Sequence, residues 1–310
     1  MKRTALFFCA GLIFILQSAA QSVNFRYTVI PEEVRPGEPV TIGVTGNVTQ
    51  AALYANNRQI GKAQFTSIPS EDGKPGFLAA ILTIPSTVNS SLVIIRLENE
   101  RGLVREITVA IKDREFRSET IRITPSLNRV LNEPHPDRAA QSNRLWGILT
   151  TTGSVYYHTG EFNPPVVSTR RTSVFGTRRV NAYPNGRTTT SIHEGVDYGV
   201  PTGTQVFACG AGMVVLAANR IVTGNSVIIE HGPGIYSVYY HLDKIEAQEG
   251  IIVDTGDLIG YSGSTGFSTG PHLHWDIRIN TENTDPDVFL SRPLLDKNLI
   301  IKNLFYLPEP

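Results

Sequence analysis

Hydrophobic and polar residues alternate in short runs over the first third of the chain, up to about Lys112. An apolar side chain at every second position is the pattern of a half-buried β-strand. Turn sequences such as Arg35-Pro36-Gly37-Glu38 separate the runs. The runs are Phe25–Val29, Val40–Val44, Leu53–Ala55, Phe77–Ile84, Leu92–Leu97 and Val104–Ile111. About seven strands at such spacing predict a β-sandwich over residues 21–112.

The spacing of these strands is typical of an immunoglobulin-like sandwich. No cluster of histidine, aspartate or glutamate marks this domain, so we expect a spacer or docking unit. Residues 113–150 follow as a linker. Alternation over Phe116–Ile123 predicts one more strand, and the prolines before Arg138 predict a helix that ends near Leu149. Its partial apolar stripe suits a helix that packs the two domains together.

A second β-rich region covers residues 151–290, where glycine is frequent and helical periodicity is nearly absent. Alternating runs such as Gly212–Ala217 and Tyr236–His241 predict an antiparallel β domain. Residues 291–310 form a C-terminal extension whose apolar stretches predict either a further strand or packing across to the first domain. The predicted fold class is therefore mainly β, with two β domains in series.

Residues 1–20 have a different character and are predicted to be removed. Lys2 and Arg3 precede an apolar run from Ala5 to Leu16, and small residues follow at Ser18 and Ala20. This order is that of a secretory signal cleaved after about Ala20, so we expect an exported protein of the periplasm or cell envelope. A membrane anchor is the alternative, but the run is shorter than the ~20 residues that span a bilayer.

Cysteine content and charge narrow the possibilities further. Cys9 lies in the predicted signal, and lipid attachment there is disfavoured because few apolar residues precede it. Cys209 then has no disulfide partner, and its apolar neighbours predict a buried thiol. The 28 basic and 28 acidic residues form no charged block, which argues against nucleic acid as a partner.

Two histidines two residues apart, His272 and His274, follow a glycine-rich loop at Gly263–Gly270. On a strand, such positions share a face about 6.5–7 Å apart, while Leu273 and Trp275 point into a core. Adjacent imidazoles suit a metal ligand beside a proton-transfer group. The spacing does not tell which of the two histidines would bind the metal.

His193 and Asp197 form a second candidate pair, four residues apart. Nearby glycines and a proline exclude a helix, and a straight strand would separate the pair by roughly 13 Å. A bend is therefore required, and Gly195 permits it. His241 closes a predicted strand, where alternation gives it the same face as Tyr239. A lone histidine in that place is either structural or functional.

Taken together, these segments resemble the lysostaphin-type (LytM-domain) zinc metallopeptidases over about residues 170–290. The matching blocks, in the family's order, are Phe175–Arg179, His193–Asp197, Pro201–Val206, Tyr239–Leu242, Val253–Gly260 and Gly263–His274. The resemblance implies one zinc ion per chain, bound by His193, Asp197 and His274. It also implies that His272 and His241 flank a zinc-activated water, as general base and as orienter of the oxyanion.

The function implied by this resemblance is that of an exported zinc metalloendopeptidase, which hydrolyses the peptide cross-bridges of bacterial peptidoglycan. The glycine-rich loop would then form a wall of the substrate groove. The alternative is a non-catalytic LytM-type module that binds and activates another cell-wall hydrolase. Relatives of that kind typically lack ligands or catalytic histidines, whereas all five positions are filled here.

Other polar residues near these blocks are weaker candidates. Arg178 and Arg179 are candidates for contacting a substrate carboxylate at the mouth of the groove. Glu194 resembles a catalytic base only through the dipeptide His-Glu, and we expect it to be incidental. The remaining histidines are expected to be structural or solvated: His135, His158 and His231.

Overall fold

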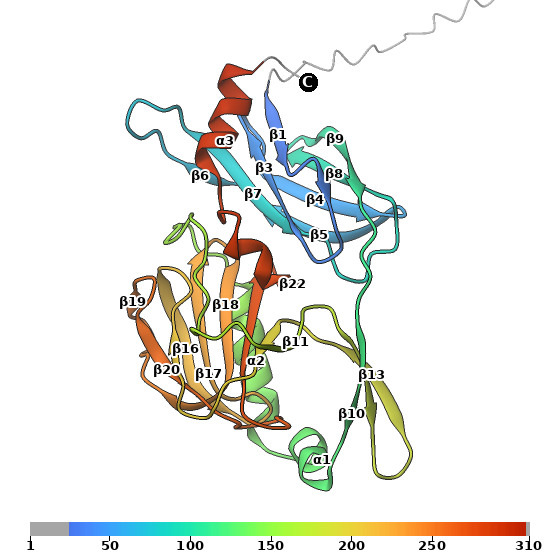
Figure 1. Ribbon diagram of the computed structural model, residues 1–310. Helices are drawn as coiled ribbons and strands as arrows, with labels where there is room; N and C mark the ends of the chain where they lie inside the picture. Colours follow the sequence, from blue (N-terminus) through green and yellow to red (C-terminus); the bar gives the residue numbers. More distant parts are fainter. Residues whose placement is uncertain (1–24, 308–310) are drawn as a thin grey trace, which may run out of the picture.

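The computed structural model describes residues 25–307, so the predicted secretion signal, with Cys9, lies outside the described residues. Two β-rich bodies lie end to end, with the N-terminal one at the top of Figure 1. Within residues 25–307, no helix combines the length and apolar composition needed to cross a bilayer. The mainly β fold class predicted from the sequence is confirmed.

The N-terminal body is a sandwich of two sheets. A four-stranded sheet has the order β1-β3-β7-β6, and a five-stranded sheet has the order β2-β9-β8-β4-β5. Their shared core contains the alternate residues Val40, Ile42 and Val44 of β3, packed with Ile95 and Leu97 of β8. The strands are β1 (Tyr27–Ile30), β2 (Glu33–Val34), β3 (Pro39–Val44), β4 (Gln50–Ala55), β5 (Arg58–Gln64), β6 (Thr66–Ile68), β7 (Phe77–Thr83), β8 (Leu92–Asn99) and β9 (Gly102–Ile111).

The segment between the two bodies contains one strand and two helices. They are β10 (Ser118–Arg122), α1 (Pro125–Asn132) and α2 (Asp137–Thr150). Only the strand and the second helix were predicted. The signal for α1 is local, because Thr124 accepts a hydrogen bond from the Leu127 amide as the N-cap and Pro125 fills the first helical position.

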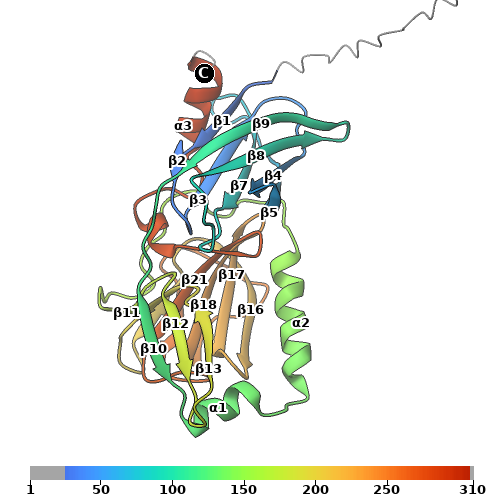
Figure 2. The ribbon, with the colours of Figure 1, turned by 90° about the vertical axis from the view of Figure 1, so that its right-hand side faces the viewer.

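Neither β10 nor α2 behaves as a simple linker. β10 pairs in parallel with β12 (Arg178–Ala182), which pairs with β13 (Thr188–Ile192) in a three-stranded sheet. The helix α2 was expected to pack the two domains together. Instead it lies along the C-terminal sheet beside β16 and β17 (Figure 2). Its Leu149 is buried in a cluster with Leu216, Ile228 and Tyr236, because the outer face of that sheet is apolar there.

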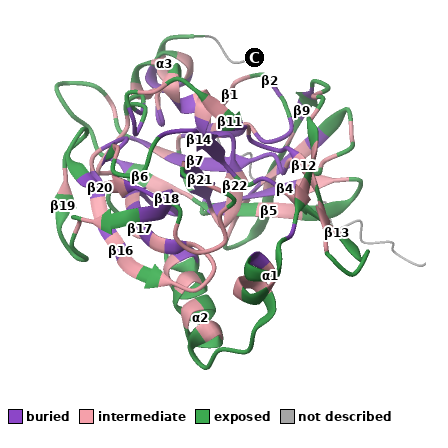
Figure 3. Ribbon diagram, turned by 60° about the horizontal axis from the view of Figure 1, so that its bottom comes forward, coloured by how far each residue is buried: buried purple, intermediate pink, exposed green. Residues whose placement is uncertain are grey.

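The C-terminal body is built on a ten-stranded sheet of order β11-β14-β21-β18-β17-β16-β19, with β15, β20 and β22 paired off this path. Every pairing is antiparallel, as predicted. Buried residues concentrate along β14 and β21, which are paired (Figure 3). The strands are β11 (Arg171–Ser173), β14 (Val196–Tyr198), β15 (Gln205–Phe207), β16 (Gly212–Arg220), β17 (Gly224–Gly232), β18 (Ile235–Ile245), β19 (Ile252–Val253), β20 (Leu258–Ser262), β21 (Leu273–Ile279) and β22 (Glu282–Thr284).

The chain ends in helical turns that return to the sandwich. A 3₁₀ turn at Pro286–Leu290 leads to α3 (Lys297–Ile301) and a π-helical turn at Lys302–Tyr306. The strand considered for this extension is therefore absent from the described residues. Ile300 is fully buried, and its Cγ2 lies so close to Gly43 of β3 that a Cβ on Gly43 would be 2.5 Å away.

Replacing Ile300 by alanine is expected to lower the free energy of unfolding by about 2–4 kcal/mol, because a buried cavity would remain where the side chain packs on β3. Urea denaturation monitored by circular dichroism measures the change. Lys302→Ala, an exposed change in the same segment, is the control and should stay within about 0.5 kcal/mol. Equal effects of the two substitutions would contradict this packing role.

Candidate metal centre

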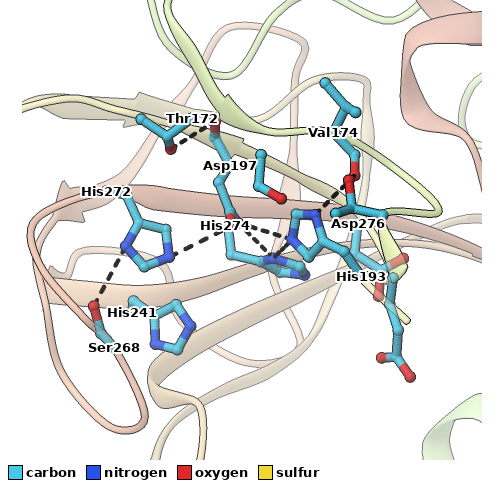
Figure 4. A network of polar contacts seen from close by, with 12 residues as sticks. Thr172, Val174, His193, Asp197, His241, Ser268, His272, His274 and Asp276 are labelled. Atoms are coloured by element: carbon cyan, nitrogen blue, oxygen red, sulfur yellow. Dashed lines mark hydrogen bonds and ion pairs between the residues drawn. The ribbon is translucent and has the colours of Figure 1, made fainter. Parts of the chain in front are cut away.

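Three predicted site residues meet where β14 and β21 run side by side. Asp197 of β14 lies directly opposite His274 of β21. On the other side of β21, Tyr240 of β18 lies opposite His274, and its ring stacks on the imidazole with centroids 5.6 Å apart. His193 enters from the bend between β13 and β14. Figure 4 shows the three side chains converging.

Their ligand atoms form a compact triangle. His193 Nε2 lies 3.0 Å from Asp197 Oδ1 and 3.0 Å from His274 Nδ1, and the last two atoms are 2.9 Å apart. The Nδ1 atom of His193 donates to the Val174 carbonyl at 3.0 Å, so its Nε2 presents a lone pair. Lone pairs and a carboxylate gathered at this distance favour a bound cation. Within residues 25–307, these three form the group that can hold a metal ion.

The donor set fits zinc. Tetrahedral zinc with bonds of about 2.0–2.2 Å places neighbouring ligand atoms about 3.3–3.6 Å apart, so a small outward movement of the three ligand atoms would admit the ion. Two imidazole nitrogens and one carboxylate oxygen leave a fourth position open, as catalytic zinc sites do. The Val174 carbonyl fixes the tautomer of His193, which is the usual support for a metal-binding imidazole.

The pKa shifts of the same residues favour the protonation states that bind a metal ion. Burial alone would raise the pKa of Asp197, but its close contacts with the His193 and His274 rings outweigh burial and hold that pKa well below its ordinary value. Burial also lowers the pKa of His193, against the opposing effect of Asp197. The carboxylate is therefore ionised and the His193 imidazole neutral, which are the protonation states that bind metals.

His241 reaches the site through an irregularity in β18. The pairing register of β18 with β17 shifts by one residue between Tyr239 and Leu242, and His241 has a left-handed φ of 62°. Alternation alone had placed His241 on the face of Tyr239, which was wrong. The extra residue turns the ring towards the three candidate metal ligands instead. The centroid of the His241 ring lies 6.3 Å from that of His274 and 4.8 Å from that of His272.

The glycine-rich loop orients both remaining histidines. The Nδ1 atom of His272 donates to the Gly270 carbonyl, and that of His241 donates to the Thr265 carbonyl, each at 2.8 Å. Each Nε2 is thus left as an acceptor when the ring is neutral. His272 Nε2 lies 3.8 Å from Asp197 Oδ1. Burial, with smaller effects of His272 and His274, lowers the pKa of His241 to about 3.

Comparison with known families identifies the domain that carries this site. The model of peptidase family M23 matches residues 191–286, which include all five converging residues. Residues 191–286 are an M23 peptidase domain. The match leaves the sandwich and the segment between the two bodies outside the family region.

Known relatives resemble this chain over the same region. DD-carboxypeptidase/endopeptidase Mpg of Neisseria meningitidis serogroup B is 40% identical over 135 residues, which are 43% of this chain and 30% of Mpg. Peptidoglycan DD-endopeptidase ShyA of Vibrio cholerae is 45% identical over 85 residues, which are 27% of this chain and 20% of ShyA. The matched region thus spans less than a third of either relative.

One solved structure is similar over most of the chain. It is described as a candidate M23 peptidase from Pseudomonas aeruginosa and has 22% sequence identity and a TM-score of 0.53. The similarity covers 82% of this chain and 94% of that one. At this identity, the likeness shows a shared fold.

The bend that brings His193 to Asp197 depends on Gly195. A Cβ built on Gly195 would lie 2.2 Å from the carbonyl oxygen of Trp275 in β21. The position therefore excludes every side chain. The required bend was predicted from the sequence, whereas the close approach to β21 was not.

Most of the weaker candidates in and around the M23 domain lie outside the cluster, as expected. Glu194 pairs with Arg278 at 2.7 Å, and Arg278 pairs with the fully buried Asp276 at 2.9 Å. His231 is buried between the Ala211 carbonyl and the Ser237 hydroxyl, each at 2.7 Å, and burial lowers its pKa to about 3. The others are placed as follows: His158 contacts the Glu161 carbonyl, His135 is exposed before α2, and Cys209 is a buried free thiol.

The two arginines have contacts other than the substrate role considered for them. Arg178 donates to the Ser86 carbonyl at 2.6 Å and covers the Phe116 ring, so it holds the linker against the sandwich. Arg179 points to the opposite face, as successive strand residues do, and donates to Asp197 Oδ2 at 3.0 Å. Both guanidinium groups are thus already engaged within the protein. Sequence reasoning missed the contact between Arg179 and Asp197, one of the three candidate metal ligands.

Proposed function

We propose that this chain is an exported zinc metalloendopeptidase that hydrolyses peptide cross-bridges of bacterial peptidoglycan. The observation that carries the proposal is the convergence of three ligand atoms with two further imidazoles, each of which has its Nδ1 held by a backbone carbonyl and its Nε2 left as an acceptor. The M23 match supports peptide hydrolysis. The similarity to ShyA, a peptidoglycan DD-endopeptidase, supports a peptidoglycan substrate, and the similarity to Mpg, a DD-carboxypeptidase/endopeptidase, agrees with it.

In this proposal His193, Asp197 and His274 hold one zinc ion. Zinc bound by such ligands lowers the pKa of water and polarises a carbonyl group. His272 accepts a proton from the attacking water at Nε2, because its Nδ1 is already committed to the Gly270 carbonyl. The same nitrogen then returns the proton to the leaving amine.

His241 has the matching orientation and completes the proton-transfer pair. Its Nδ1 is held by the Thr265 carbonyl, so Nε2 accepts a hydrogen bond from the water while the ring is neutral. Because burial keeps the resting ring neutral, this nitrogen can donate to the oxyanion only after it has taken up a proton during the reaction. The left-handed backbone at His241 costs about 1 kcal/mol or more, and strain of this kind clusters at functional sites.

The alternative function is that of a non-catalytic module that activates another cell-wall hydrolase. It requires a surface for that hydrolase but no proton-transfer groups beside the metal ligands. The aligned nitrogens of His272 and His241 therefore favour the enzyme. The fold alone does not distinguish the two functions.

Chelation should separate them. Purified mature protein is incubated with peptidoglycan, with and without 1,10-phenanthroline, and the soluble fragments are identified by mass spectrometry. We expect peptide release that falls to background with chelator and returns when zinc is restored. A zinc-loaded, folded protein that releases no peptides, yet stimulates a second wall hydrolase, would refute the enzyme and support the alternative.

A further inference from the structure

Asp197 uses its two carboxylate oxygens for different partners. Oδ1 lies in the triangle with His193 and His274. Oδ2 instead accepts a hydrogen bond of 3.0 Å from the Arg179 guanidinium. Asp197 is buried, so water offers no comparable support to the second oxygen.

The guanidinium of Arg179 is itself held from two other sides. Its Nε donates to Glu119 Oε1 at 2.6 Å, and the same terminal nitrogen that reaches Asp197 lies 3.0 Å from the Ser173 hydroxyl. Ser173 also donates to Glu119 at 3.2 Å. The side chains of Arg179 and Glu119 are 22% and 30% exposed, so this ion pair is partly shielded from solvent.

We propose that Arg179 is a positioning residue that fixes Asp197 as a one-oxygen metal ligand. A carboxylate free to rotate can present both oxygens to a metal and raise its coordination number. Holding Oδ2 leaves only Oδ1 for the metal and keeps the fourth position open. Residues that support metal ligands in this way typically change metal affinity by about 10- to 100-fold.

Glu119 resolves the electrostatic difficulty of this arrangement. A lone arginine beside a dication would repel it, and in a partly buried place the repulsion is weakly screened. Glu119 neutralises the guanidinium through the 2.6 Å contact, so the pair acts as a neutral hydrogen-bond donor towards Asp197. Both charges are therefore required for the effect on the metal site.

The pair also brings the inter-domain segment into the metal site. Glu119 lies on β10, outside the region matched by the M23 family, and is the register partner of Arg179 on β12. A segment that leaves the sandwich thus contributes, through Arg179, to the support of a ligand in the peptidase domain. The neighbouring Arg178 faces the other way, contacts Ser86, and provides a matched control.

The test measures metal affinity, because the inference depends on the proposed zinc site but not on peptide cleavage. The double variant Arg179→Met with Glu119→Gln keeps the net charge and similar volumes while removing the donor. Zinc affinity is measured by competition with a chelating dye, and the visible spectrum of the cobalt-substituted protein reports the coordination number. Circular dichroism establishes that each variant is folded.

We expect the double variant to bind zinc about 10- to 100-fold more weakly and to show the weaker cobalt absorption of a five-coordinate site. The single variant Arg179→Lys should bind zinc more tightly than the double variant, because lysine keeps one donor. The zinc affinity of the control Arg178→Met should stay within about twofold of that of the unaltered protein. A folded double variant with unchanged affinity and an unchanged cobalt spectrum would overturn the inference alone. Failure of the unaltered protein to bind zinc would refute the zinc site itself.

Discussion

Replacing His272 by alanine is expected to reduce peptide cleavage by about 10²- to 10⁴-fold while zinc remains bound. His272 lies beside the ligand triangle without belonging to it, with Nε2 3.8 Å from Asp197 Oδ1. The substitution would therefore impair proton transfer and leave zinc binding intact. Turnover on peptidoglycan and zinc content by elemental analysis measure the two properties separately.

His274→Ala provides the opposite outcome on the same strand face. It removes one corner of the triangle, so zinc binding and cleavage should fall together. Zinc at 100 times its dissociation constant stabilises a protein by about 2.7 kcal/mol, and this increase should persist in His272→Ala but vanish in His274→Ala. His135→Ala, at an exposed position, controls for the loss of a histidine. Zinc loss in His272→Ala, or zinc retention in His274→Ala, would reverse the assignment.

The sequence predicted where His272 and His274 lie but not which of them binds the metal. Period-two alternation correctly placed His272 and His274 on one face, with Leu273 and Trp275 in the core. It could not assign their roles, because both positions are equivalent on an ideal strand. The difference arises from Asp197, which pairs with His274 across β14 and β21, and such pairing has no local signal.

Local irregularity explains the failure at His241. Alternation assumes an unbroken strand, and one extra residue in β18 reverses the face of the next side chain. The sequence gives little warning, because a left-handed φ is uncommon for any residue other than glycine, even for histidine, which adopts it more often than most. The glycine-rich loop, which was predicted to form a wall of the substrate groove, also has carbonyl groups that hold His241 and His272.

Long-range contacts explain the rest. The sandwich and the antiparallel sheet follow from alternation, because each strand records its own buried face. Glu119 and Arg179 are far apart in the sequence, and only the parallel pairing of β10 with β12 brings them together. The C-terminal extension has an apolar stretch that suits a strand or a helix equally well. Its contact with β3 decides between them.

Substituting Gly195 by alanine is expected to abolish tight zinc binding and to lower the free energy of unfolding by about 1–3 kcal/mol. The added methyl group would lie 2.2 Å from the carbonyl oxygen of Trp275 and 3.0 Å from the Cα atom of Asp276. Both are backbone atoms of β21, which is paired on one side with β14 and on the other with β18. The strand cannot retreat, so the bend between His193 and Asp197 must open.

Gly147→Ala is the matched control for this substitution. Gly147 lies inside α2, and a Cβ there meets no atom within 4 Å. Alanine should stabilise that helix by about 0.5–1 kcal/mol, the opposite sign to the change at Gly195. Urea denaturation and dye competition for zinc measure both effects.

Gly195 has no left-handed φ, so alanine would be tolerated there if conformational freedom were its only role. A Gly195→Ala variant that is as stable and binds zinc as tightly as the unaltered protein would show that β21 yields, and that the bend is not what holds the ligands together.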